Sequence, residues 1–216
     1  MAGISFRNRL IAIPVVVTFG VTLLRLTGEL MDWSEQLFSR EAGGGMAIVG
    51  IVWLIPFLAF YFGWSLTIKG DMSDSPWKVL AFSVAGFALL IGFMFLANWM
   101  FEQFTVASIL TAAVGAVAVG LFVFQGSPPL FSKLVWYGLA ARIPVAIIML
   151  MAMIGNWNTH YDAPPPGFPE MGVLARWVTI GLIPQLTVWI TFTMVFGGFF
   201  AGIAVFIARR RATVHH

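Results

Sequence analysis

Apolar residues along this chain fall in long continuous runs. A helix needs about 20 mostly apolar residues to cross a bilayer, and six runs approach or exceed that length, at roughly 10–27, 46–68, 79–100, 104–124, 130–154 and 172–208. Strands of a transmembrane barrel would instead alternate apolar and polar residues over about ten positions. The pattern therefore predicts an all-α fold, a polytopic bundle of about six membrane-spanning helices.

The last run, 172–208, is too long for a single crossing. About 36 residues at 1.5 Å each give roughly 54 Å, against a hydrocarbon core near 30 Å. Pro184 divides the run. We expect residues 185–208 to make the crossing, and residues 172–183 to lie at the interface or to extend the helix. The alternative is a re-entrant pair of half-helices.

Basic side chains predict how the bundle is oriented. With six crossings, most loop and tail lysines and arginines fall on one side, including Lys69, Lys78, Lys133 and Arg209–Arg211. Cytoplasmic loops carry an excess of such residues. We therefore expect both the N- and the C-terminus in the cytoplasm, with 1–208 as one transmembrane domain and 209–216 as a basic cytoplasmic tail.

Composition agrees with a membrane location. Hydrophobic residues make up 60% of the 216 and charged residues 10%, and the mean hydropathy is +0.92. The basic residues are scattered or terminal, which excludes the stripe expected of a nucleic-acid-binding protein. The predicted partner is the lipid bilayer, in a multi-pass protein of the plasma membrane, or the inner membrane if the chain is bacterial.

Small residues mark the predicted helix contacts. They recur four apart on the fourth and sixth runs, at Ala112, Ala116, Gly120, Gly198 and Gly202. Membrane helices associate through such faces because small residues let backbones approach closely. These faces predict packing inside the bundle, or against a second copy of the chain or a partner membrane subunit.

Arg142 is the most informative polar residue, because a charge within a membrane helix is costly. It lies near the middle of the fifth run, two residues before Pro144. One interpretation is a cation in the bundle interior that pairs with a carboxylate or receives an anionic substrate or lipid phosphate. The other is a side chain that reaches toward the headgroups.

Two further polar faces accompany Arg142. Thr18, Thr22, Arg25 and Glu29 share one face of the first helix, where Arg25 and Glu29 can pair. This stripe is either an interfacial ion pair with its neighbours or the wall of a water-filled vestibule. Thr187 and Thr191 extend the small-residue face of the sixth helix, so they either pack against a neighbour or line a polar path.

The loop at 156–162 carries the candidate acid–base chemistry. His160 and Asp162 can act as base and orienter or ligate a metal, with Glu102, Glu29 or Asp32 as partners. Alternatively the loop is anchored at the headgroups with polar tips in water. Two ligands one residue apart fall short of a zinc motif, and no nucleotide-binding or haem-attachment pattern is present. We expect no metal and no cofactor.

Three functions follow as hypotheses. The first is a small transporter or channel-like protein with a polar path near Arg142. The second is a membrane-embedded enzyme that acts on a lipid or lipid-linked substrate at the external face, with His160, Asp162 and Glu102 as its catalytic groups. The third is a non-catalytic accessory or scaffold subunit, in which these polar groups would be dispersed.

Overall fold

The fold is all-helical. The computed structural model describes residues 2–45 and 47–214, with side chains for 10–45 and 47–211. Helix accounts for 76% of the structure, and the described residues form no strand. Met46, where the second predicted run starts, and residues 215–216 of the predicted tail lie outside the described residues. The long helices are α1 (Ala2–Leu30), α2 (Leu54–Ile68), α3 (Pro76–Met100), α4 (Val106–Phe124), α5 (Pro128–Gly155) and α8 (Val188–Val214).

Six apolar helical segments are long enough to cross a bilayer. Within the described residues these are Leu10–Leu30, Ile51–Ile68, Pro76–Met100, Val106–Phe124, Pro128–Gly155 and Val173–Arg211. The prediction of an all-α bundle with six such helices is confirmed. Proline begins α3 and α5, where its missing N–H would have had no helical partner.

The second segment begins later than the apolar run that predicts it. A short 3₁₀ turn, η2 (Ile51–Trp53), leads into α2. Residues 47–50 belong instead to the linker after α1, where the carbonyl oxygen of Val49 accepts a hydrogen bond from Arg25. Hydropathy alone does not separate these residues from the helix, because Ala47, Ile48 and Val49 are themselves apolar.

The last segment is a chain of helical pieces. It comprises α6 (Val173–Arg176), the π-helical turn η3 (Trp177–Leu182), α7 (Ile183–Leu186) and then α8. Pro184 lies in the first turn of α7, and Thr187 interrupts the helix with φ −118° and ψ −73°. A π-helical turn leaves the i→i−4 pattern, so the irregular backbone is concentrated at residues 177–187.

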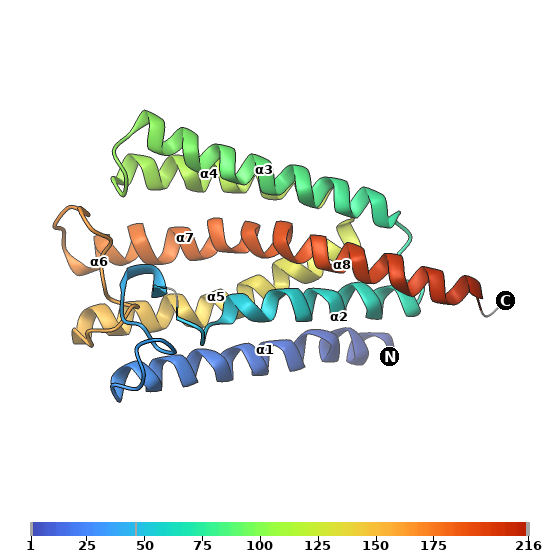
Figure 1. Ribbon diagram of the computed structural model, residues 1–216, viewed down its shortest axis with the longest axis horizontal. Helices are drawn as coiled ribbons and strands as arrows, with labels where there is room; N and C mark the ends of the chain where they lie inside the picture. Colours follow the sequence, from blue (N-terminus) through green and yellow to red (C-terminus); the bar gives the residue numbers. More distant parts are fainter. Residues whose placement is uncertain (1, 46, 215–216) are drawn as a thin grey trace.

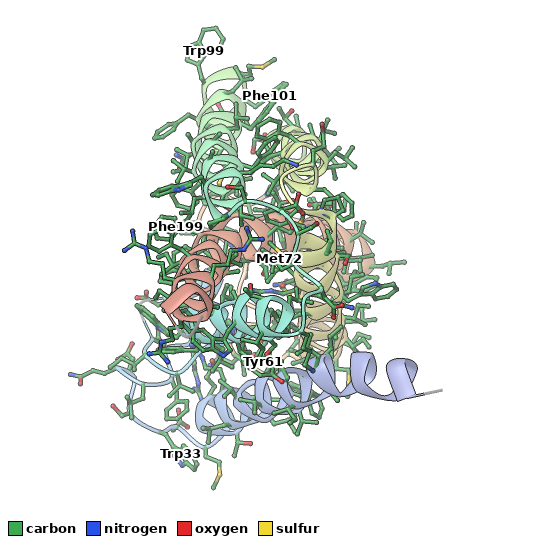
Figure 2. The ribbon with its side chains drawn as sticks, turned by 90° about the vertical axis from the view of Figure 1, so that its right-hand side faces the viewer. Trp33, Tyr61, Met72, Trp99, Phe101 and Phe199 are labelled. Carbon is green, nitrogen blue, oxygen red and sulfur yellow. The ribbon has the colours of Figure 1, made fainter. Side chains whose placement is uncertain are left out.

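Helix α8 occupies the middle of the bundle. It contacts α2, α3, α4 and α5, whereas α1 packs mainly against α5. The α3–α4 hairpin stands on one side of α8 and α1 on the other (Figure 1; Figure 2, where Trp99 and Trp33 lie at opposite extremes). The first residues of α1 and the last residues of α8 lie at the same end of the bundle (Figure 1), which we call the terminal end; the opposite end is the distal end.

Small residues make the contacts of α8 close. A Cβ at Gly63 of α2 would lie 2.4 Å from the carbonyl oxygen of Ala201. One at Gly198 would lie 2.4 Å from Ser83 Oγ, and one at Gly202 would lie 2.8 Å from a carbon of Leu80. A larger residue at Gly63 would require the backbone to move, and one at Gly198 or Gly202 would require neighbouring side chains to shift.

Helix α4 approaches α8 in the same manner. Gly120 faces Thr191, whose hydroxyl donates to the carbonyl oxygen of Ala116 at 2.8 Å. Ala112, one turn further along, is half-buried. The small-residue faces of the fourth and sixth runs therefore lie largely inside this chain.

The main apolar cluster fills the part of the bundle nearer the terminal end. Phe62, Phe131 and Leu134 have no exposed surface and pack within one cluster together with residues of α2, α3, α4, α5 and α8. A second, smaller cluster at the distal end contains Val145, Met149 and Tyr161. The polar residues of the spans lie between and beside these clusters.

Candidate functional site

A cavity of about 390 Å³ opens at the distal end of the bundle. Its walls come from α1, α5, the η3–α7–α8 segment and the two linkers that follow α1 and α5. The side chains that define its chemistry are Arg25, Arg142, His160, Gln185 and Trp189. No carboxylate is among the described lining residues, so its charged groups are basic.

Arg142 is a buried cation without an anionic partner in the described part of the chain. The residue is only 5% exposed. Nη1 donates to Oε1 of Gln185 at 3.3 Å, and the guanidinium carbon lies 4.5 Å from the ring centroid of Trp189. Among the described residues no Asp or Glu lies within ion-pair distance of it. Its side chain makes no other hydrogen bond to the described residues, and it lines the cavity.

Arg25 is equally buried, but four of its five N–H groups donate hydrogen bonds. Nε donates to Oε1 of Glu29, one turn along α1. Nη1 donates to the carbonyl oxygen of Val49 at 2.6 Å, and Nη2 donates to those of Ser39 at 2.7 Å and Gly44 at 2.9 Å. The guanidinium therefore organises the whole linker between α1 and α2, and the Arg25–Glu29 pair is neutral.

The linker meets this guanidinium through a glycine turn. Gly43, Gly44 and Gly45 all have positive φ, at 72°, 89° and 53°, a region that residues with a Cβ seldom adopt. A Cβ at Gly44 would lie 3.4 Å from Arg25 Nη2 and 3.5 Å from Cδ2 of His160. The tract is a defined turn that brings a carbonyl group against Arg25.

Glu29 also holds His160. The carboxylate is 1% exposed and lies 2.5 Å from Nδ1 of His160, and it accepts the backbone N–H of the same residue at 2.9 Å. An ionised carboxylate can only accept a hydrogen bond, so Nδ1 of His160 must carry the proton that it shares with Glu29. In the neutral ring, Nε2 is then unprotonated and its lone pair is free to accept. His160 lines the cavity, and it therefore presents a base there.

The rest of the loop fixes the position of His160. Asp162 accepts hydrogen bonds from the backbone N–H groups of Asn158 at 2.9 Å and Thr159 at 2.7 Å. Tyr161 donates to the carbonyl oxygen of Thr22 at 3.4 Å. Burial, with the negative charge of Glu29, raises the pKa of Tyr161, which keeps its hydroxyl a donor. Asp162 is thus a loop cap rather than a partner of the imidazole.

The remaining sequence candidates lie away from the cavity. Glu102 is exposed in the turn between α3 and α4, and its side chain has no hydrogen bond or ion pair to the described residues. Thr187 donates to the carbonyl oxygen of Ile183 in its own helix, and Thr191 donates to Ala116 of α4. Neither threonine lines the cavity.

Two lining residues were not singled out from the sequence. Gln185 directly follows Pro184, and Trp189 lies one turn later. A polar side chain after a proline within an apolar run, and a tryptophan away from both predicted interfaces, are the signals that mark them. Together they flank the guanidinium of Arg142.

The cavity is closed toward the terminal end. On α5 its lining starts at Arg142, about two turns beyond the fully buried Leu134. Phe62 and Phe131 fill the bundle on the other side of that boundary. The described lining residues therefore form a one-sided pocket, without a continuous pore.

Fold and pocket together define a helical multi-pass membrane protein with a basic internal cavity. The chain matches no protein-family model, no curated protein and no solved structure. Among the described residues no group of three His, Asp or Glu side chains is arranged to hold a metal ion. The chemistry available in the cavity is anion binding by a guanidinium and proton transfer by an imidazole.

Proposed function

We propose that this protein is a small transporter whose cavity binds an anion that carries an apolar group. The observation that carries the proposal is Arg142, a buried cation without a carboxylate partner among the described residues, beside open space. An uncompensated charge in a membrane interior is costly and marks substrate or ion pathways. A guanidinium recognises carboxylate, sulfonate or phosphate groups through charge-assisted hydrogen bonds.

The walls of the cavity support an amphiphilic ligand. Beside Arg142 lie Val145, Met149 and Ile180, and Trp189 offers an aromatic face. Trp53, which is 64% exposed, stands at the edge. An anionic lipid headgroup and a small aromatic or acyl acid share this chemistry. With the orientation that the lysines and arginines predict, the cavity opens away from the cytoplasm, in a plasma or bacterial inner membrane.

One-sided access suits a transporter better than a channel. A channel needs a continuous polar path, whereas alternating access exposes a central site to one side at a time. Here the main apolar cluster closes the terminal end, and the irregular backbone at 177–187 borders the cavity. We propose that movement of this segment opens the other side.

Naphthalene-1-sulfonate, a permanent monoanion with an aromatic body, tests the proposal. Binding is measured by calorimetry in phosphatidylcholine nanodiscs, with the neutral naphthalene-1-sulfonamide as matched probe. Arg142→Ala should weaken sulfonate binding by about tenfold or more, the equivalent of a charge-assisted hydrogen bond. Thr187→Val, outside the cavity, should bind as the wild type does.

Two further experiments test whether the natural anion is a lipid headgroup or a soluble acid, and whether the protein transports the anion or only binds it. If a lipid headgroup is the natural ligand, phosphatidylglycerol in the nanodisc should compete with the sulfonate. Proteoliposomes loaded with the sulfonate should release it through the wild type and not through Arg142→Ala. Equal affinity for sulfonate and sulfonamide, or unchanged binding by Arg142→Ala, would overturn the proposal.

The Glu29–His160 pair favours a second candidate function. A carboxylate that fixes an imidazole with its Nε2 free is the arrangement of a general base, so the cavity also suits an enzyme that hydrolyses a lipid-linked ester. Release of inorganic phosphate from octyl phosphate by the wild type, and its loss in His160→Asn, would favour this candidate. Recovery of intact octyl phosphate favours the transporter.

A further inference from the structure

The cavity contains a second group that an anion would meet, and it is titratable. His160 lines the same cavity as Arg142, with its side chain 18% exposed. Because Nδ1 is held by Glu29, the free Nε2 is the atom that gains a proton. Imidazole changes charge between about pH 5 and pH 8, within the range where cells work.

We propose that anion binding in this cavity is linked to uptake of one proton by His160. The inference rests on the proposed anion-binding function. A neutral imidazole leaves the cavity with the single uncompensated charge of Arg142, since Arg25 is neutralised by Glu29. A protonated imidazole raises that charge from one to two, and a bound anion stabilises the protonated ring.

The groups that face His160 support this charge balance. From α1, Glu29 contacts the ring and Arg25 pairs with the same carboxylate. From its own loop, Tyr161 lies with its ring centroid 3.9 Å from that of the imidazole. From α5, Arg142 lines the same cavity, while the described residues of the α1–α2 linker that line it carry no charge.

The proton also defines the class of substrate. With His160 protonated, the cavity carries two uncompensated positive charges. It therefore accommodates a phosphate monoester dianion better than a sulfonate monoanion with the same apolar group. In a transporter, anion and proton would then cross together, and deprotonation of His160 would favour release of the anion. The protonation state of the imidazole thus sets the preferred charge of the ligand, and the proton gradient would supply the driving force for transport.

The test uses naphthalene-1-sulfonate, because this probe does not titrate and any proton taken up must go to the protein. Calorimetry in buffers of different ionisation enthalpy gives the number of protons bound. The affinity of the wild type should fall by about tenfold between pH 6 and pH 8, which corresponds to uptake of about half a proton on average over that range. His160→Asn keeps a donor toward Glu29 but cannot titrate, so its affinity should not vary with pH.

The outcomes distinguish this inference from the proposed function. Arg142-dependent binding without proton uptake overturns only the role of His160, as does an unchanged pH dependence in His160→Asn. Absence of Arg142-dependent binding overturns both. If His160→Asn fails to fold, His160→Gln replaces it, and the proton count of the wild type alone still decides whether the linkage exists.

Discussion

Arg25 and Arg142 are both buried, both 5% exposed, and both line the same cavity, yet their surroundings are opposite. Arg25 has a carboxylate and three carbonyl oxygens as acceptors, whereas Arg142 has one amide oxygen and an aromatic face. The first satisfies its charge within the protein. The second holds a charge that no described carboxylate neutralises, which is the charge that the proposed anion would meet.

Burial alone does not give a charged side chain its role; the acceptors around it do. Desolvation is costly for both guanidinium groups. For Arg25 the cost is offset by contacts that order the linker between α1 and α2, so its role is structural. For Arg142 no described contact offsets it fully, which is the pattern of a residue retained at the expense of stability.

The largest expected effect is loss of stability in Arg25→Ala. The variant leaves Glu29 and three carbonyl groups without their donor, and breaking a buried pair costs about 3–5 kcal/mol. Denaturant unfolding in detergent measures the loss. Lys78→Ala is the control: Lys78 is exposed and its ion pair with Asp74 is 3.5 Å long, and such pairs contribute about 0–1 kcal/mol. An equal loss in both variants would contradict a central role for Arg25.

A smaller effect of opposite sign is expected for Arg142→Met. Methionine fills a similar volume, contacts Trp189 through its sulfur, and removes an uncompensated charge. Replacing buried charged groups with apolar residues is often neutral or stabilising by about 1–4 kcal/mol. We expect the free energy of unfolding to rise by about 1 kcal/mol while sulfonate binding is lost. A fall as large as that of Arg25→Ala would show that Arg142 is structural.

The fold was predictable because the bilayer imposes one length on every crossing. The limit of that reasoning is visible at residues 47–50, which are apolar but belong to a linker. Arg25 and Glu29 are four apart on one helix, so their pairing follows from helix geometry. Arg142 stood out for its position within a span.

The site itself could not be assembled from the sequence. The sequence offered Glu29 as one of three carboxylate partners for His160 without selecting among them. His160, in the linker after α5, meets Glu29 of α1 across 131 positions, and only the tertiary fold makes that selection. Asp162, two residues away, was an equal candidate, but the loop turns its carboxylate toward its own backbone. Which of two polar neighbours faces a cavity depends on backbone conformation, which a residue pattern does not encode.

The smallest expected effect comes from comparing alanine at a glycine of the cavity wall with alanine at a glycine of a turn outside the cavity. Gly44 and Gly167 both have positive φ, at 89° and 78°, so alanine at either position should cost about 1 kcal/mol of stability. A Cβ at Gly167 meets nothing within 4 Å, whereas one at Gly44 contacts Arg25 and His160.

Gly44→Ala should therefore also weaken sulfonate binding, because the methyl group occupies space in the cavity. We expect a loss of several-fold, below that of Arg142→Ala, because the added Cβ would lie 3.4 Å from Arg25 and 3.5 Å from His160, at ordinary van der Waals distances. Gly167→Ala should bind as the wild type does. If both variants bind alike, the glycine turn serves only to complete the acceptors of Arg25, and the wall of the cavity near His160 is not in contact with the anion.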